Sequence, residues 1–424
     1  MGINENNAGL SFPQKALSLA KKLAGKIDWK CVVAVLVAFI ITRMMVVVVT
    51  YLSMAQLPIR DYPYIFRYNP RNLIADGLIR WDSEHYVHTA QHGYSTDDLK
   101  AIPFFPFYSI LIRFAAIFTG NIWTSGLWVS NLSFLAALFY LYAIAKREFD
   151  EEIAGRTVFY ISAAPTAFFF SVVYNESVYL LLILMCFYYA RNGKWLIAAI
   201  AGSLATATRL QGVFASVIIL LEALWLQGFR FFPKPWSFKA QLTQLKQDLL
   251  AIPKAWKGIL AAVVSLSGLF AYMIYLHYQV GDPLAFLHVT DALWGKGFSA
   301  DWLPRLIKYT TLMYGDIGNL FSGEIGNFQY VLDPIFALLT LPLIVIAIFK
   351  FRPAYAMFAL MSFLVPLMSG QVISMQRYVL PIVPVYFVLA LWGKRKWVDR
   401  MIIGVFLPLQ AYLLVLFSHW YYAG

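Results

Sequence analysis

Charged residues are scarce in this sequence of 424 residues, since they make up only 13% of it, whereas 60% is hydrophobic and 17% aromatic. A soluble protein of this length would expose much of that apolar surface to water. The scarcity of charge therefore excludes a soluble globular protein and predicts an integral membrane protein. Cysteine is rarer still, because only Cys31 and Cys186 are present and both lie in apolar segments. No disulfide framework can be read from them.

A small-residue cleavage pattern is also missing after the first long apolar run, so we expect this run to be an anchor and not a cleaved signal peptide. Four apolar runs are each about long enough to cross a hydrocarbon core of ~30 Å as a helix: residues 31–52, 258–279, 330–349 and 401–422. These runs are continuous and not alternating, which predicts an all-α protein. Neither an internal repeat nor a change of composition divides the chain, so residues 1–424 are expected to form one polytopic membrane domain.

Acidic residues are outnumbered by basic ones, 22 to 34, which gives a formal net charge of +12. The basic excess lies in connecting segments, as the positive-inside rule produces in membrane proteins, and this argues against a nucleic-acid partner. We expect residues 1–30, 228–257 and 394–400 to be cytoplasmic, the second of them as an amphipathic loop. The connections 53–122 and 280–329 lack this excess and are expected to be the first and second outer loops.

Shorter apolar stretches complete the predicted topology. Residues 195–208 and 211–227 are expected to form a hairpin with Arg209 near its outer tip. Residues 103–119 contain Arg113 in their middle, which favours a surface-lying or re-entrant helix at the outer face. With these assignments the chain crosses the membrane about eleven times.

The stretch RWDSEHYVHTAQHGY, residues 80–94, concentrates polar chemistry in the first outer loop. Helical character over residues 72–92 would place four of its side chains within one face: Asp82, His85, Thr89 and His92. Glu84 points about the opposite way from Asp82, so these two are poor candidates for a cooperating carboxylate pair. The stretch is compatible with a metal site on its histidines, a solvated interfacial helix, or a catalytic loop in which Asp82 is the general base.

Other charged residues, distant in sequence, are brought by this topology to the same outer side. They are Glu84, Glu176, Arg209, Asp333 and Arg377. The guanidinium groups of Arg209 and Arg377 match phosphate oxygens in a bidentate way. For either arginine alone, a salt bridge or a lipid-headgroup contact explains the charge equally well, but the two together favour an anionic lipid substrate.

Four sequence blocks resemble, in the same order, the GPI mannosyltransferase II (PIG-V) family of the GT-C superfamily. They are RWDSEHYVHTAQHGY with PFFPFY, then APTAFFFSVVYNES, ATRLQG and QRY, spanning roughly residues 30–395. The resemblance implies a GT-C-type helical bundle whose long first outer loop carries surface helices and the catalytic carboxylate. The donor would be a polyprenyl- or dolichyl-phosphate monosaccharide, typically mannose, transferred with inversion. Asn175, Leu210 and Gln211 depart from the family pattern, and the acceptor need not be a GPI precursor.

Carried over position by position, the resemblance makes Asp82 the catalytic base. The positions expected to bind substrate are Arg80, Trp81, Glu84, His85, His92, Glu176, Arg209 and Arg377. Arginine can stabilise a phosphate leaving group without a metal, so no metal or cofactor is expected beyond the lipid-phosphate-linked sugar itself. Such a donor needs a groove at membrane level, which residues 103–119 and the 195–227 hairpin could wall.

The expected partners are the bilayer, the lipid-linked donor and a lipid-linked acceptor, and relatives that act with partners allow for a small membrane subunit. The resemblance places the active site on the outer or luminal face of a prokaryotic plasma membrane or an endoplasmic reticulum membrane. A lipid-linked-sugar flippase or other transporter, and an accessory subunit of a glycosylation complex, are the alternatives. A transporter would not need a carboxylate in a long outer loop, and transporters often carry internal repeats, which are not visible here.

Overall fold

The computed structural model describes residues 28–61, 66–96, 98–230, 244, 248–322, 329–369 and 373–424. This described part is helical, apart from turns and one isolated antiparallel bridge between Phe298 and Ser369. Most of the predicted cytoplasmic segments 1–30 and 228–257 lies outside the described residues. The predicted crossing number and the sides of the loops stay predictions.

Within the described residues, five stretches are long and apolar enough to cross a membrane. They are α2 (Trp29–Gln56), α6 (Ile122–Glu148), α12 with α13 (Trp256–Val264 and Ser267–Val280), most of α16 (Gln329–Lys350) and α20 (Lys396–Ser418). Four of the five correspond to the apolar runs predicted from the sequence, although α20 ends at Ser418, before the predicted end of the last run at 422. A helix satisfies its own backbone hydrogen bonds, as a segment surrounded by lipid must. The chain is therefore an integral membrane protein.

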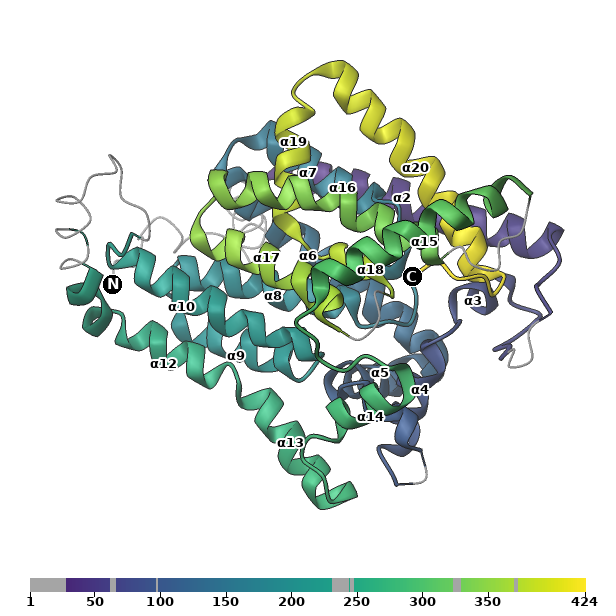
Figure 1. Ribbon diagram of the computed structural model, residues 1–424, viewed down its shortest axis with the longest axis horizontal. Helices are drawn as coiled ribbons and strands as arrows, with labels where there is room; N and C mark the ends of the chain where they lie inside the picture. Colours follow the sequence, from purple (N-terminus) through teal and green to yellow (C-terminus); the bar gives the residue numbers. More distant parts are fainter. Residues whose placement is uncertain are drawn as a thin grey trace, which may run out of the picture.

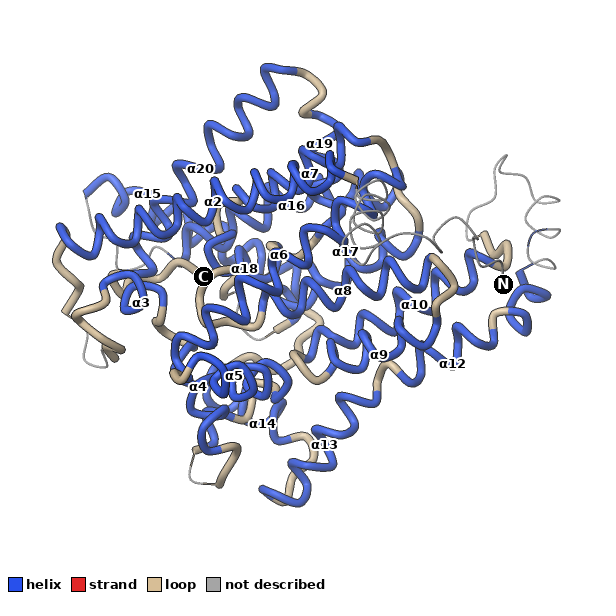
Figure 2. The backbone as a smooth tube through the Cα atoms, turned by 180° about the vertical axis from the view of Figure 1, so that it is seen from behind, coloured by secondary structure: helices blue, strands red, loops and turns tan. Residues whose placement is uncertain are grey.

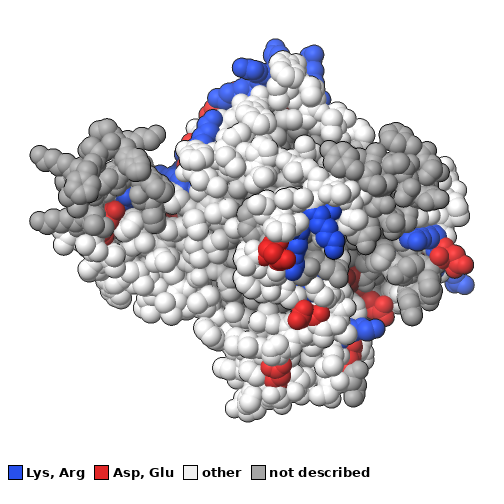
Figure 3. All heavy atoms as spheres, viewed as in Figure 1, with Lys and Arg blue, Asp and Glu red and all other residues white. Residues whose placement is uncertain are grey.

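Shorter helices fill the space between these spans (Figure 1). They are α3 (Leu73–Leu78), α4 (Ser83–His92), η2 (Leu99–Ala101), α5 (Pro106–Thr119), α7 (Glu151–Ala163), η3 (Ala167–Phe170), α8 (Glu176–Arg191), α9 (Trp195–Thr206), η4 (Leu210–Val213), α10 (Phe214–Leu226), α14 (Ala285–Trp294), α15 (Trp302–Ser322), α17 (Pro353–Met368), α18 (Met375–Val379) and α19 (Val383–Trp392). The predicted helices over 103–119, 195–208 and 211–227 are confirmed as α5, α9 and α10. Figure 3 shows few charged side chains on this face of the molecule. Several basic side chains lie together over the connection between α19 and α20.

The core is centred on α7, η3 and α8. Helix α7 packs against α2, α6 and α19, and α8 packs against α6, α9 and α10, so both lie inside the bundle (Figure 2). Phe170 is fully buried and its ring stacks on Phe134 at 4.4 Å. Arg43, a charge within the first span, donates to the carbonyls of Ser162 and Ala167, where α7 ends and η3 begins. Its charge therefore stabilises this break in the helices.

The predicted single helix over 72–92 is wrong, because the chain forms α3 and α4 with a turn between them. Trp81 in this turn has a φ of +55°, which no helix accommodates. Asp82 consequently precedes α4 as its N-cap and does not lie on the face of a continuous helix.

The apolar run 258–279 is likewise broken, into α12 and α13. The hydroxyl of Thr206 lies 3.0 Å from the carbonyl of Ser265 and accepts from the amide of Leu269 at 3.2 Å. A side chain of α9 thus satisfies backbone groups that the break leaves free.

Buried ion pairs of Asp76 stabilise the connection between α2 and α6. Its carboxylate is fully buried, and its Oδ2 lies 2.9 Å from nitrogens of both Arg67 and Arg80. Burial alone would raise the pKa of Asp76, but hydrogen bonds and charge from the two arginines outweigh it and lower this pKa. A lowered folded-state pKa adds stability above the unfolded pKa and loses it as the pH falls.

We expect Asp76→Asn to lower the free energy of unfolding at neutral pH by about 3–5 kcal/mol, because the charge of Arg80 is left buried without its carboxylate partner. Unfolding in detergent from about pH 7 to about pH 3 should show the wild type losing this advantage below about pH 4. Parallel profiles for the two proteins would contradict the interpretation.

Candidate active site

Four of the charged residues predicted from the sequence meet in one group, which we call the charge cluster: Asp82, Glu176, Arg209 and Arg377. Asp82 Oδ2 lies 2.8 Å from Arg377 Nη1, and Arg377 Nε lies 3.2 Å from Glu176 Oε1. The same Glu176 oxygen lies 3.4 Å from Arg209 Nη1. Asp82 and Arg377 are 295 positions apart in the sequence, and these ion pairs join them in one network.

The elements that carry the cluster are tied together by buried polar contacts. Glu176 begins α8, and the preceding Asn175 donates its side-chain amide to the carbonyl of Thr208 at 2.8 Å. That contact fixes the start of α8 against the turn that carries Arg209. Asn175, a departure from the family pattern, thus has a structural role here.

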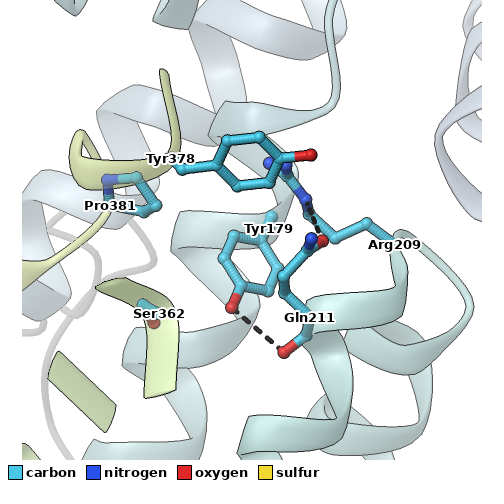
Figure 4. A pocket seen from close by; sticks show the side chains of 6 residues that line it. All are labelled: Tyr179, Arg209, Gln211, Ser362, Tyr378 and Pro381. Carbon is cyan, nitrogen blue, oxygen red and sulfur yellow. Dashed lines mark hydrogen bonds between the residues drawn. The ribbon is translucent and has the colours of Figure 1, made fainter. Parts of the chain in front are cut away.

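Arg209 is held by a hydrogen bond and by two aromatic rings. Its Nε donates to the side-chain oxygen of Gln211 at 2.8 Å, and its guanidinium lies 5.2 Å and 5.5 Å from the rings of Tyr179 and Tyr378. Figure 4 shows these residues lining a small pocket with Ser362 and Pro381. Gln211 is a second departure from the family pattern, and here it orients the arginine.

Arg377 and Asp82 share a further aromatic residue. Tyr174 accepts a hydrogen bond from the backbone amide of Asp82 at 3.1 Å, and its ring lies 5.2 Å from the guanidinium of Arg377. Tyr174 is buried and belongs to the same VVYNES segment as Glu176. It therefore fixes Asp82 and Arg377 relative to one another.

The two carboxylates of the cluster differ in exposure. The Asp82 side chain is 31% exposed, whereas that of Glu176 is 1% exposed. Two arginines neutralise two acids, which offsets the cost of burying Glu176. Asp82 is thus the carboxylate of the cluster that is accessible from solvent, and Glu176 is placed to hold the two guanidinium groups in position.

Other predicted residues lie around the cluster without joining it. Arg80 is wholly buried and donates to Asp76 and to the carbonyl of Ser418, so its charge is paired outside the charge cluster. The Trp81 ring packs on Trp420 at 5.1 Å. Glu84 is exposed.

The histidines of the stretch do not converge. His85 stacks on Phe104 at 4.7 Å, and His88 lies 3.3 Å from Asp98 with its ring 4.9 Å from that of His92. Across the described residues, His, Cys, Asp and Glu form no group of three or more that could hold a metal ion.

An apolar cavity of about 520 Å³ lies between α4, α5, α9 and α13. Its walls include Thr89, Ala90, Pro106, Phe107, Ser109, Ile110, Arg113, Ser203, Leu204, Ala207, Gly268, Ala271, Tyr272 and Tyr275. Two of these elements, α5 and α9, are those expected to wall a groove at membrane level. The amide of Phe107 donates to the carbonyl of Ala207 at 2.9 Å, two residues before Arg209. The part of the cavity wall formed by Phe107 and Ala207 therefore lies next to the turn that carries this arginine.

Sequence reasoning missed the aromatic and amide residues of the site: Tyr174, Tyr179, Gln211 and Tyr378. Gln211 was visible only as a departure from a motif, and Tyr378 only as the neighbour of Arg377. In a chain that is 17% aromatic, a tyrosine by itself carries no signal. Their roles depend on the fold that surrounds them.

Comparison with known proteins gives a distant relationship. No family model matches the chain. It is 24% identical over 209 residues to GPI mannosyltransferase 2 of two strains of Cryptococcus neoformans, covering 46% of this chain and 46% of that protein. The chain thus matches about half the length of these curated relatives.

Among solved structures, the oligosaccharyltransferase of Archaeoglobus fulgidus tethered with an acceptor peptide has a TM-score of 0.47 at 14% identity, covering 94% of this chain and 56% of that one. The same archaeal enzyme in complex with an inhibitory peptide and a dolichol-phosphate has a TM-score of 0.44 at 12% identity, covering 92% and 56%. The resemblance to the GPI mannosyltransferase II (PIG-V) family is confirmed by the curated relatives as a distant similarity over 46% of the chain.

Proposed function

We propose that this protein is a GT-C-type glycosyltransferase that moves a hexose, in the first place mannose, from a polyprenyl-phosphate-type donor to a hydroxyl of a glycolipid-type acceptor at the outer face. The observation that carries the proposal is the ion pair of 2.8 Å between Asp82, the accessible carboxylate, and Arg377. Arg209 lies beside it through the shared partner Glu176. The distant similarity to GPI mannosyltransferase 2 supports it.

The cluster suits a displacement at the anomeric carbon. A donor phosphate that binds Arg377 and Arg209 competes with the carboxylates for these guanidinium groups. Asp82 is then released from its ion pair and can take the proton of the acceptor hydroxyl. The acceptor oxygen forms its bond to the anomeric carbon while the bond from that carbon to the phosphate oxygen breaks. The phosphate leaves with the electron pair, stabilised by the arginines, and the sugar is inverted.

The apolar cavity is the place we propose for the lipid chain of the donor. It is lined mostly by apolar side chains, and its wall at Ala207 lies two residues before Arg209. A chain bound there would have its phosphate end at the charge cluster. Arg113, the charged residue of the cavity wall within the described part, is exposed and is suited to contact lipid headgroups.

Leu204→Trp should narrow this cavity, because Leu204 lines it from α9. We expect kcat/KM for a long-chain polyprenyl-phosphate sugar to fall by about tenfold, and the value for a donor with two isoprene units to change little. Leu196→Trp is the matched control, since Leu196 is on the same helix, is 74% exposed and does not line the cavity. Equal losses with both donors would argue against the cavity as the lipid site.

The function itself is tested with purified protein in nanodiscs, given radiolabelled polyprenyl-phosphate-mannose and a lipid extract. Label appearing in a new lipid supports the proposal. Labelled donor that moves between leaflets of proteoliposomes without any transfer would favour a transporter instead. Absence of both activities with mannose, glucose and galactose donors would overturn it.

A further inference from the structure

Ser418, the last residue of α20, and residues 419–424 that follow it form a segment that contacts both chain segments presenting the Asp82–Arg377 ion pair. In Figures 1 and 2 the C-terminal end of the chain lies between α18 and α3. The segment carries two aromatic residues with separate contacts, Trp420 and Tyr422. Neither has a place in the motifs that point to the charge cluster.

Trp420 supports the turn that precedes Asp82. Its side chain is buried, and its ring packs on that of Trp81 at 5.1 Å. The guanidinium of Arg80 lies 5.5 Å from the same ring, and its Nε donates to the carbonyl of Ser418 at 3.1 Å. The turn at Arg80 and Trp81 is therefore held against this segment by a ring contact and a buried hydrogen bond.

Tyr422 supports the turn that precedes Arg377. Its hydroxyl accepts from the amide of Ser374 at 2.6 Å and donates to Asp333 Oδ2 at 3.2 Å. The other oxygen of Asp333 accepts from the amide of Met375 at 2.6 Å. Asp333 is 1% exposed and belongs to α16, so Tyr422 and Asp333 together anchor the start of α18, which carries Arg377.

Backbone geometry distinguishes these contacts from ordinary packing. In the part of the chain that the structure describes, three non-glycine residues have a positive φ: Trp81 at +55°, Ser374 at +67° and Trp420 at +66°. All three take part in the contacts of this segment. Residues other than glycine disfavour a positive φ, because their side chains meet the backbone there. Such backbone strain persists only where the surrounding structure holds it, most often at functional sites.

We propose that Trp420 and Tyr422 are positioning residues that hold Asp82 and Arg377 in the geometry of their ion pair, one from each side. The consequence for catalysis rests on the proposed function. The coupling between the two turns does not rest on the proposed function, because it can be measured without any substrate.

Tyr422→Phe removes one hydroxyl and keeps the ring. Hydrogen exchange followed by mass spectrometry should show faster exchange both in peptides covering residues 373–379 and in peptides covering residues 80–86, where the Asp82 amide donates to Tyr174. Tyr421→Phe is the matched control, since the Tyr421 ring lies 5.1 Å from the guanidinium of Arg60 and not against Asp333. It should leave both peptides unchanged.

In the transfer assay, Tyr422→Phe should lower kcat by about tenfold, because a displaced reacting group loses the benefit of orientation. KM for the donor should stay within about twofold, since both arginines remain. Trp420→Leu removes the ring that supports the turn at Trp81, so it should also speed hydrogen exchange in the same two peptides and lower kcat. Trp420→Phe keeps a ring against Trp81 and should retain most of kcat.

Faster exchange at 373–379 alone, with 80–86 unchanged, would overturn the proposal whether or not the protein transfers sugar. Faster exchange in both segments with an unchanged kcat would overturn the catalytic half of it. If the wild type transfers no sugar, the proposed function fails. The exchange data then still decide whether Tyr422 couples the two turns.

Discussion

Asp82→Asn is expected to reduce sugar transfer by about 10²–10⁴-fold, the usual contribution of a general base. The amide keeps the size of the carboxylate and can still accept a hydrogen bond from Arg377, which lies 2.8 Å from Asp82 Oδ2. It cannot take the proton of the acceptor hydroxyl. The loss should therefore fall on kcat, and donor affinity should stay the same or increase, because Arg377 no longer has a charged competitor for the phosphate. Single-turnover transfer and equilibrium donor binding measure the two effects separately.

Asp98→Asn is the matched control for this substitution. Asp98 lies in the same connection between α2 and α6 as Asp82 and 3.3 Å from His88, outside the charge cluster. It should leave transfer and binding unchanged. Equal transfer by the wild type and the Asp82→Asn protein would remove Asp82 as the base and would point to Glu84 or Glu176. A loss of donor binding with no loss of single-turnover rate would instead assign Asp82 to substrate binding.

The long spans and the charged residues of the site could be predicted from the sequence because both are conspicuous in so apolar a chain. A run of about 20 apolar residues has few structural alternatives. A charge within such a chain must find a partner or a cavity. Glu176, Arg209 and Arg377 were predictable as a group for this reason. Their pairing distances were not, since these depend on how α8, η4 and α18 pack.

The breaks in the helices could not be predicted, because they are stabilised from elsewhere in the fold. Neither proline nor glycine marks the turn at Trp81, which is supported by Trp420. The break near Ser265 depends on the hydroxyl of Thr206. Arg80 is the instructive case, because Asp76 lies four residues before it, at the spacing of a helical ion pair. That spacing indicates a structural role for Arg80, and the substrate-binding role expected from its motif stays a prediction.

Arg377 is the residue of the charge cluster whose loss should affect both folding and activity. It is the shared partner of the two carboxylates, at 2.8 Å from Asp82 and 3.2 Å from Glu176. Glu176 is almost wholly buried, and without Arg377 its remaining partner is Arg209 at 3.4 Å. Breaking a buried ion pair from one side leaves a charge that water does not reach and that, here, only the more distant Arg209 compensates. This costs about 3–5 kcal/mol in typical cases.

We therefore expect Arg377→Met to lower the free energy of unfolding by about 3–5 kcal/mol and to lower transfer by at least about 10²-fold, the cost of losing one donor to a developing oxyanion. Adding Glu176→Gln should recover part of the stability, because the incompletely compensated charge is removed, but none of the transfer. Detergent unfolding curves and the transfer assay report the two effects. Lys394→Met, which breaks an exposed pair with Asp150, should cost no more than about 1 kcal/mol. A double variant no more stable than Arg377→Met alone would show that Glu176 is not held as a charge by Arg377.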